Sequence, residues 1–129
     1  MKIVEGLQFF ENNKKKEGVI VLPSGVQYEI LSAGTGEKPK SDDEVTVHYK
    51  GTLLDGTQFD SSYDRNTPFV TSLNNVIQGW KEGVPLMPVG SKYRFYIPYQ
   101  LAYAERGQGS SIPPYSGLIF DIELLKVSQ

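Results

Sequence analysis

The sequence predicts an α+β domain in which one antiparallel sheet buries a face against a short helix. Four segments alternate apolar and polar residues with the period of a strand. Asp55-Gly56, after the second of them, is a strong hairpin signal. Only one internal segment, around Leu73 to Val84, has helical spacing, which favours a sheet packed on a single helix. With 129 residues, of which 39% are hydrophobic, the chain is long enough for one compact domain.

A helix is expected before the sheet, from Ile3 to Lys16. Ile3, Leu7 and Phe10 fall on one face of this helix. Lysines at positions 14, 15 and 16 lie at its C-terminal end, where positive charge complements the helix dipole. Gly18 is a plausible end signal. We interpret the lysine run as a solvated helix end rather than as a site for an anionic partner.

Strand character begins after Gly18. Residues 19–22 are short and β-branched, and Pro23-Ser24-Gly25 is expected to be a turn. Residues 26–30 then alternate, with Val26, Tyr28 and Ile30 on the apolar face. The segment from 33 to 43 contains Gly, Lys and Pro, and we expect it to be a loop.

Three further strands are predicted over 45–53, 92–97 and 118–127, and each has one apolar face. The inward residues are expected to be Val45, Val47, Tyr49 and Leu53; Tyr93, Phe95 and Ile97; and Leu118, Phe120, Ile122 and Leu124. The internal helix contains Trp80 and ends at Pro85. It must be short, because its two glycines, at 79 and 83, cost about 1 kcal/mol each relative to alanine.

The composition argues against several classes of function. A net charge of -2 disfavours a nucleic-acid binder, which needs a basic surface. The absence of Cys excludes disulfides, thiol catalysis and Cys-based metal sites. No stretch approaches the roughly 20 apolar residues of a membrane span. The first residues lack the apolar region of a signal peptide.

Reactive groups are also scarce. The single His, His48, lies on the outward face of its strand, so a Ser/His/Asp triad is weakly supported and no metal site is expected. Hydrolysis by paired carboxylates would use Asp55, Asp60 and Asp64, but aspartates in loops are more often turn formers. The glycines at 107 and 109 open no helix and do not form a nucleotide-binding fingerprint.

An apolar binding site is the remaining candidate. Asp60 lies close to Phe59, Phe69 and Trp80, and a carboxylate in such surroundings loses hydration unless it is hydrogen-bonded or paired. Arg65 is a nearby candidate partner. An apolar cavity with one or two fixed polar groups is a common form of ligand site. A simple small-ligand carrier is an alternative with no further support in the sequence.

Six ordered segments carry a resemblance to a known family: Val45–Leu53, Gly56–Ser62, Val76–Trp80, Met87–Gly90, Ile112–Pro114 and Leu118–Leu125. Together they resemble the FKBP-type peptidyl-prolyl cis-trans isomerases, the macrolide-binding immunophilins, over roughly Ser24 to Val127. The stretch from Phe9 to Gly18 resembles the bacterial Mip-like branch, in which a long helix joins a dimerisation domain to the isomerase domain. We expect only the end of such a helix in this chain.

The resemblance implies a five-stranded antiparallel half-barrel sheet wrapped around one short helix. It divides the chain into a linker helix segment, 1–18, and an isomerase domain, 19–129. Asp60 and Tyr103 would be the catalytic polar groups, and Trp80 would form the floor of the pocket. The Ile77 backbone N–H would meet a ligand carbonyl. The implied substrate-binding residues are Tyr49, Phe59, Phe69, Val76, Ile77, Trp80, Ile112 and Phe120.

The implied activity is acceleration of X-Pro rotation in polypeptides, which assists protein folding and needs no cofactor. The implied ligands are proline-containing polypeptides and macrolides such as tacrolimus or rapamycin. We expect this chain to be monomeric and the full-length protein to be a homodimer. The Mip-like relatives imply the periplasm or cell envelope, with the cytoplasm as the alternative.

Three departures from the family pattern lie in or beside the flap over the pocket. Ala104 stands where relatives usually have Gly, and the pairs Tyr99-Gln100 and Tyr115-Ser116 are also atypical. A position that needs φ > 0 disfavours Ala. These departures favour an alternative function, a non-catalytic FKBP-like binding or chaperone module.

Overall fold

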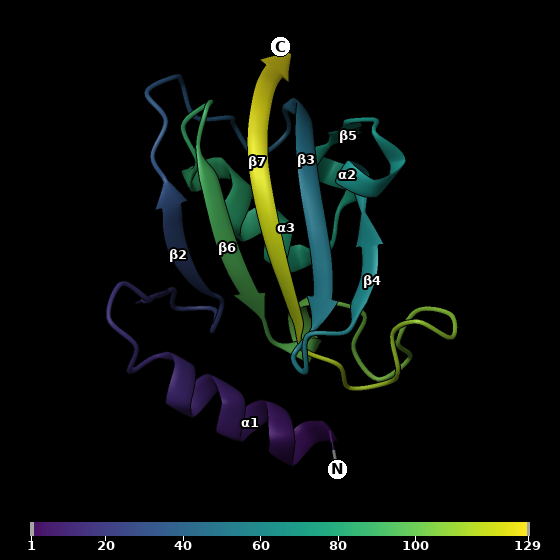
Figure 1. Ribbon diagram of the computed structural model, residues 1–129. Helices are drawn as coiled ribbons and strands as arrows, with labels where there is room; N and C mark the ends of the chain where they lie inside the picture. Colours follow the sequence, from purple (N-terminus) through teal and green to yellow (C-terminus); the bar gives the residue numbers. More distant parts are fainter. Residues whose placement is uncertain (1, 129) are drawn as a thin grey trace.

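The computed structural model, which describes residues 2–128, has one antiparallel sheet with the strand order β1-β2-β6-β7-β3-β4, and β5 also pairs with β3 (Figure 1). The strands are β1 (Ile20–Val21), β2 (Gln27–Ser32), β3 (Glu44–Leu53), β4 (Gln58–Ser61), β5 (Phe69–Ser72), β6 (Lys92–Ile97) and β7 (Leu118–Ser128). The helices are α1 (Lys2–Asn13), α2 (Ser62–Arg65) and α3 (Gln78–Gly83), with 3-10 turns η1 (Leu73–Asn75), η2 (Val84–Leu86) and η3 (Tyr99–Leu101).

The sheet agrees with the expected half-barrel when β4 and β5 are counted as one interrupted strand. Both pair with β3, and α2 separates them. The Ser61 hydroxyl caps α2 by accepting a hydrogen bond from the Asp64 N–H, and Asn66 ends it with a left-handed φ of 56°. The two-residue β1 is an additional edge strand. Residues 58–72 have no sustained periodicity, so the sequence pattern predicts none of the three elements β4, α2 and β5.

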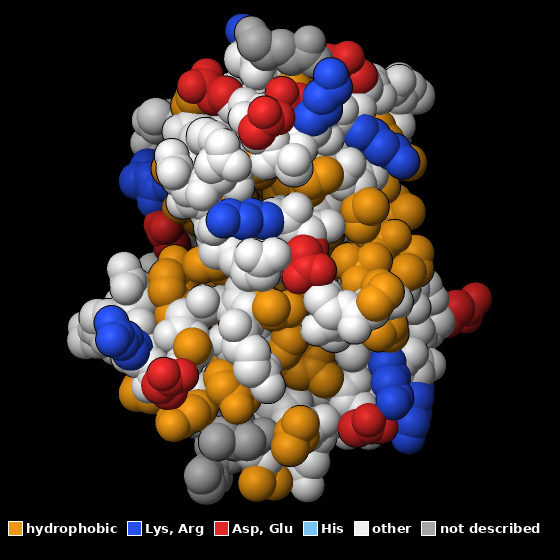
Figure 2. Space-filling view, turned by 180° about the vertical axis from the view of Figure 1, so that it is seen from behind, with side chains coloured by type: hydrophobic (Ala, Val, Ile, Leu, Met, Phe, Trp, Pro, Cys, Tyr) orange, Lys and Arg blue, Asp and Glu red, His pale blue; other side chains and the backbone are white. Residues whose placement is uncertain are grey.

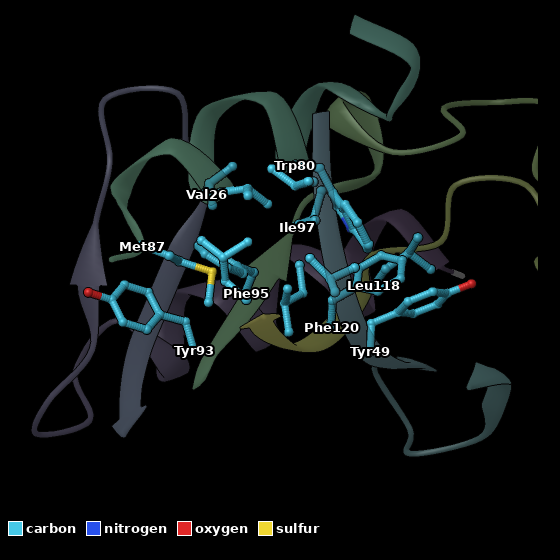
Figure 3. Packing of buried hydrophobic residues seen from close by; sticks show 14 of the residues in the cluster. Val26, Tyr49, Trp80, Met87, Tyr93, Phe95, Ile97, Leu118 and Phe120 are labelled. Carbon is cyan, nitrogen blue, oxygen red and sulfur yellow. The ribbon is translucent and has the colours of Figure 1, made fainter. Parts of the chain in front are cut away.

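The core lies between the sheet and α3. Every residue predicted to point inward from β3, β6 and β7 is buried, with at most 7% of its surface exposed. Close packing groups Trp80, Tyr49 and Phe120 at one end of the cluster and Met87 and Tyr93 at the other (Figure 3). The first group also borders an apolar cavity.

The two glycines of α3 allow the helix to approach the sheet closely. A Cβ on Gly79 would lie 2.6 Å from Ile97 Cγ2, and one on Gly83 would lie 2.5 Å from Phe95 Cε1. The two glycines therefore lower the helix propensity of α3 but allow its backbone to contact β6. The predicted helix from 73 to 84 is in fact η1, α3 and η2 in series, because Val76 and Ile77 are extended.

The N-terminal helix ends earlier than predicted, at Asn13 rather than Lys16. The buried Asn13 amide donates to Gln27 Oε1 at 2.8 Å, and Gln27 Nε2 donates to the Phe10 carbonyl at 3.0 Å. The predicted apolar face of this helix is also wrong in part, because Leu7 is 63% exposed. The ring of Phe9 lies 5.9 Å from that of Tyr96 instead.

The placement of α1 changes the burial of the sheet's outer face. Figure 1 shows α1 across the end of the sheet at which β3 and β6 terminate. Gln27 and Tyr96 alternate outward but are buried, since α1 contributes contacts to both. Ile30, predicted to be inward, is 48% exposed because β2 runs beyond the core near the sheet edge. Both predicted turns are confirmed, with positive φ at Gly25 and Gly56.

Replacing Gly79 by Ala tests the close approach of α3. We expect Gly79→Ala to lower the free energy of unfolding by about 1–3 kcal/mol, because the new methyl group overlaps Ile97. Gly6→Ala is the control, since a Cβ there meets nothing within 4 Å, and it should raise the free energy by about 0.5–1 kcal/mol. Urea denaturation measures both. Equal effects of the two substitutions would contradict this packing argument.

Candidate active site

An apolar cavity of about 410 Å³ is bordered by β3, β4, β5, β7 and the start of α3. Nine of the ten predicted site residues line it. Its walls are Tyr49, Phe59, Asp60, Phe69, Asn75, Val76, Ile77, Trp80, Tyr103 and Phe120. Seen from the side that carries α3, hydrophobic side chains run across the middle of the molecular surface (Figure 2).

Trp80 forms the floor of this cavity. Its ring is 5% exposed and stands edge-on to three other rings: Tyr49 at 5.4 Å, Phe120 at 5.3 Å and Phe69 at 6.4 Å between centroids. Within residues 2–128, its indole Nε1 is the one buried side-chain polar atom without a hydrogen-bond partner. The perpendicular rings offer only weak acceptors to this N–H, so the floor is essentially apolar.

Asp60 carries the charge in the cavity wall, and both of its oxygens are engaged. Oδ2 accepts a hydrogen bond from the Tyr49 hydroxyl, while Oδ1 accepts from Arg65 Nη1 and from the Ser61 N–H at 2.9 Å. Arg65 Nη2 also donates to the Tyr49 hydroxyl oxygen at 3.3 Å. The predicted pairing of Asp60 with Arg65 is therefore confirmed.

These contacts determine the protonation of the cluster. Burial alone raises the pKa of Asp60, but the hydrogen bonds from Tyr49 and Arg65, with the Arg65 charge, outweigh it and hold that pKa below its ordinary value. Burial and the bond to Asp60 raise the pKa of Tyr49. At neutral pH, Asp60 is thus an ionised acceptor with occupied oxygens, which is a poor arrangement for a general base.

Two other donors at the cavity have no acceptor among the described residues. The Tyr103 hydroxyl is one, and its pKa is raised by burial and by the Asp60 charge, so it keeps its proton. The backbone N–H of Ile77, just before the first turn of α3, is the other. Two free donors beside an apolar floor can hold the carbonyl oxygens of a ligand.

The segment that the family resemblance identifies as the flap spans residues 99–117, and it contributes Tyr103 to the cavity wall. Ala104 has a left-handed φ of 52°; its N–H donates to the Tyr99 carbonyl at 2.9 Å, and its carbonyl accepts from the Tyr115 N–H at 3.0 Å. Ile112 does not line the cavity, contrary to the prediction. It is 3% exposed, forms two backbone hydrogen bonds with Gln108 and belongs to the hydrophobic core.

The alternative catalytic groups are separated from one another. His48 lies on the outer sheet face, as predicted, and contacts Ser62. Asp55 accepts from the Thr57 N–H at 2.9 Å, and Asp64 accepts from Gln58 Nε2 at 2.7 Å, so both serve local structure. Residues 2–128 contain no group of three acidic, His or Cys side chains suited to a metal ion. None of the described helices is long and apolar enough to cross a membrane.

Two larger hollows, of about 600 and 500 Å³, lie against α1. The first has charged walls that include Lys50, Arg94 and Asp121. The second lies beside Leu7 and Pro98. The smaller cavity has six aromatic residues in its wall, against two and three in the larger hollows, so it is the candidate active site.

A sheet curled around a short helix, with an aromatic cavity and two free donors between them, defines a domain of the proline-isomerase class. The chain belongs to the FKBP-type peptidyl-prolyl cis-trans isomerase family, because the model of that family matches residues 35–125. A second model, for the domain amino-terminal to the FKBP-type isomerase, matches residues 2–30.

Individual relatives agree with this assignment. The chain is 54% identical to the FKBP-type isomerase FkpA of Aeromonas hydrophila, covering 97% of this chain and 46% of that protein. It is 51% identical to the 22 kDa FKBP-type isomerase of Escherichia coli, covering 95% and 60%. A crystal structure of an isomerase from Pseudomonas syringae matches with a TM-score of 0.93 and 39% identity, covering 99% of this chain and 94% of that one. The chain thus spans about half the length of these curated relatives.

The left-handed backbone at Ala104 generates a stability prediction. We expect Ala104→Gly to raise the free energy of unfolding by about 0.5–1 kcal/mol, because glycine adopts this φ without steric penalty. Ala33→Gly is the control: Ala33 is in a loop and lacks a positive φ, so the same change should be destabilising there. Urea denaturation would contradict the argument if both substitutions lowered stability equally.

The lowered pKa of Asp60 predicts a pH dependence of stability. Above the ordinary pKa of 3.8 the carboxylate is ionised in both states, and its stabilising contacts are complete. As pH falls through the lower folded pKa, the carboxylate is protonated and this stability is lost. The difference in free energy of unfolding between wild type and Asp60→Asn should be constant above about pH 5 and shrink below about pH 4. A difference undiminished at about pH 2 would overturn this expectation.

Proposed function

We propose that this domain accelerates the cis-trans rotation of X-Pro bonds by binding the proline ring over Trp80. The observation that carries the proposal is the combination of an aromatic floor with two donors, the Tyr103 hydroxyl and the Ile77 N–H, that have no acceptor among the described residues. Proline is the residue whose preceding peptide bond populates both isomers appreciably. Its ring is apolar and matches the aromatic floor. The carbonyls on either side of the ring need donors and match the two donors of the cavity.

Desolvation supplies the proposed catalysis. The barrier to rotation, about 18–20 kcal/mol, comes from the resonance of the planar amide. The planar amide is more polarised than the twisted one and is stabilised more by water at its carbonyl. Transfer to an apolar cavity removes that water and favours the twisted form relative to the ground state. Lowering the barrier by about 7 kcal/mol gives roughly a 10⁵-fold acceleration.

The polar residues have distinct proposed roles. The Ile77 N–H and the Tyr103 hydroxyl orient carbonyl groups of the substrate, because both are donors without an internal acceptor. Asp60 holds Tyr49 and Arg65 in place and presents negative charge to the twisting carbonyl carbon. No proton transfer or covalent intermediate is required, which is consistent with the absence of Cys and the remote position of His48.

A non-catalytic binding module is the second candidate. The feature that favours it is the flap, where Ala104 and Tyr115 both adopt a left-handed φ, 52° and 61°. A flap held in this unfavourable backbone conformation can cover a bound segment and still leave the amide poorly placed for rotation. The two candidates differ in turnover rather than in binding.

We further infer an assembly and additional ligands. Residues 1–18 are proposed to be the end of a linker helix and 19–129 the isomerase domain; the match of residues 2–30 to the amino-terminal family model supports a preceding segment. The 129-residue chain is proposed to be monomeric, the full-length protein a homodimer, and the aromatic cavity a binding site for macrolides. Light scattering of the purified 129-residue chain tests whether it is monomeric.

The activity test follows the cis-to-trans conversion of a tetrapeptide with one Leu-Pro bond. We expect wild type to accelerate it and Tyr103→Phe to lower kcat/KM about three- to tenfold through loss of one donor. Tyr28→Phe is the matched control, because it removes a phenol hydroxyl from outside the cavity. Macrolide binding is followed by the fluorescence of Trp80, the single Trp.

The double substitution Asp60→Ala with Tyr103→Phe separates the two candidates. Lost turnover with retained binding of an unfolded, proline-containing polypeptide supports the isomerase and shows that binding uses other contacts. A wild-type chain that binds tacrolimus but gives no acceleration refutes the enzyme assignment and favours the module.

A further inference from the structure

Ser62 joins α2 to β3 at a point just outside the cavity. Its side chain is fully buried. The hydroxyl oxygen accepts a hydrogen bond from the Tyr49 backbone N–H at 2.7 Å, and the hydroxyl donates back to the Tyr49 carbonyl at 3.3 Å. It also lies 2.8 Å from His48 Nδ1. One serine therefore contacts the backbone of a cavity residue and a side chain on the opposite face of the sheet.

His48 is held firmly on that outer face. Its ring is stacked on the ring of Tyr63 at 4.7 Å between centroids. The Tyr63 hydroxyl donates to Glu123 Oε1 at 2.9 Å, and Lys92 Nζ lies 5.5 Å from the Tyr63 ring. Glu123 is also the cross-strand neighbour of His48 in the β3–β7 ladder. The imidazole is consequently a fixed partner for Ser62 rather than a freely rotating surface group.

The same serine connects the two side-chain donors of the Asp60 cluster, Tyr49 and Arg65. Tyr49 is attached to Ser62 through its backbone. Arg65 is attached because Ser62 begins the four-residue helix that Arg65 ends. Tyr49 and Arg65 then meet at Asp60, one on each carboxylate oxygen. A shift of Ser62 relative to β3 changes the separation of these two donors and so the placement of Asp60.

We propose that Ser62 and His48 are positioning residues, which fix Tyr49 and Asp60 in the cavity wall from the opposite face of the sheet. A serine hydroxyl has one proton and two acceptor positions. The Tyr49 N–H occupies one acceptor position, and His48 Nδ1 engages either the proton or the second lone pair, depending on the tautomer. Without His48, the hydroxyl retains only the long bond to the Tyr49 carbonyl as a second contact.

The expected effect on rate rests on the proposed isomerase function. The positioning of the cavity wall by Ser62 and His48 does not depend on that function. Trp80, the single Trp, lies 5.4 Å from the Tyr49 ring, so its fluorescence reports the cavity wall without any substrate. If wild type fails to accelerate the Leu-Pro tetrapeptide, the proposed function fails, and the fluorescence comparison still decides whether Ser62 and His48 position the wall.

The experiment compares Ser62→Ala, His48→Phe and His48→Asn with wild type. Phe keeps a ring against Tyr63 but lacks the nitrogen, whereas Asn places a polar atom near the position of Nδ1. We expect Ser62→Ala and His48→Phe to lower kcat about three- to tenfold with KM within about twofold, and to shift Trp80 emission. His48→Asn should restore both readouts. Thr46→Val, on the same strand and outer face, is the matched control and should change neither.

Two results overturn the inference. In the first, Ser62→Ala lowers the free energy of unfolding in urea but leaves kcat and Trp80 emission of the folded protein unchanged, which assigns Ser62 a purely structural role. In the second, His48→Asn lowers kcat as much as His48→Phe does, or Thr46→Val lowers kcat as much as either. This result would show that the effect does not depend on the hydrogen bond at Nδ1.

Discussion

The close approach of α3 to the sheet is the constraint on which the site depends. Gly79 and Gly83 present no side chain to Ile97 and Phe95, so the helix backbone lies directly on β6. Trp80, between them in sequence, then enters the core edge-on to rings from β3, β5 and β7. A helix placed farther out would leave a larger and wetter space. The apolar character of the cavity floor, on which the proposed catalysis by desolvation relies, follows from two missing side chains.

The charge beside that floor is tolerated because it is fully bonded. A carboxylate near aromatic rings loses much of its hydration, which is unfavourable without compensation. Tyr49, Arg65 and the Ser61 N–H provide that compensation to Asp60. The same bonds occupy its oxygens and leave Tyr103 and the Ile77 N–H as the donors open to a ligand. Stability and the proposed function are therefore linked through one carboxylate, whose two side-chain partners, Tyr49 and Arg65, both connect to Ser62.

Much of this arrangement follows from local patterns. The alternation in β3, β6 and β7 correctly separates the inward from the outward residues, since strand side chains alternate and one face must be buried. Nine of the ten site residues proposed from the family resemblance line the cavity, and seven of these nine lie in its ordered motifs. Such predictions succeed where one property of a residue, its hydrophobicity, decides its position. Ile112 shows the limit: it has the right character, but the flap directs it into the core.

The sequence by itself determined the fold class, the inward faces of the main strands, and the chemical character of a site rich in aromatic rings and poor in nucleophiles. Only the tertiary structure decided where α1 ends and what it covers, because Asn13, Gln27 and Tyr96 meet across distant segments. It also decided the interruption between β4 and β5 and the contact of His48 with Ser62, whereas sequence alternation could describe His48 only as outward. Side-chain hydrogen bonds between strands depend on the register of both partners, and no single stretch of sequence contains that information.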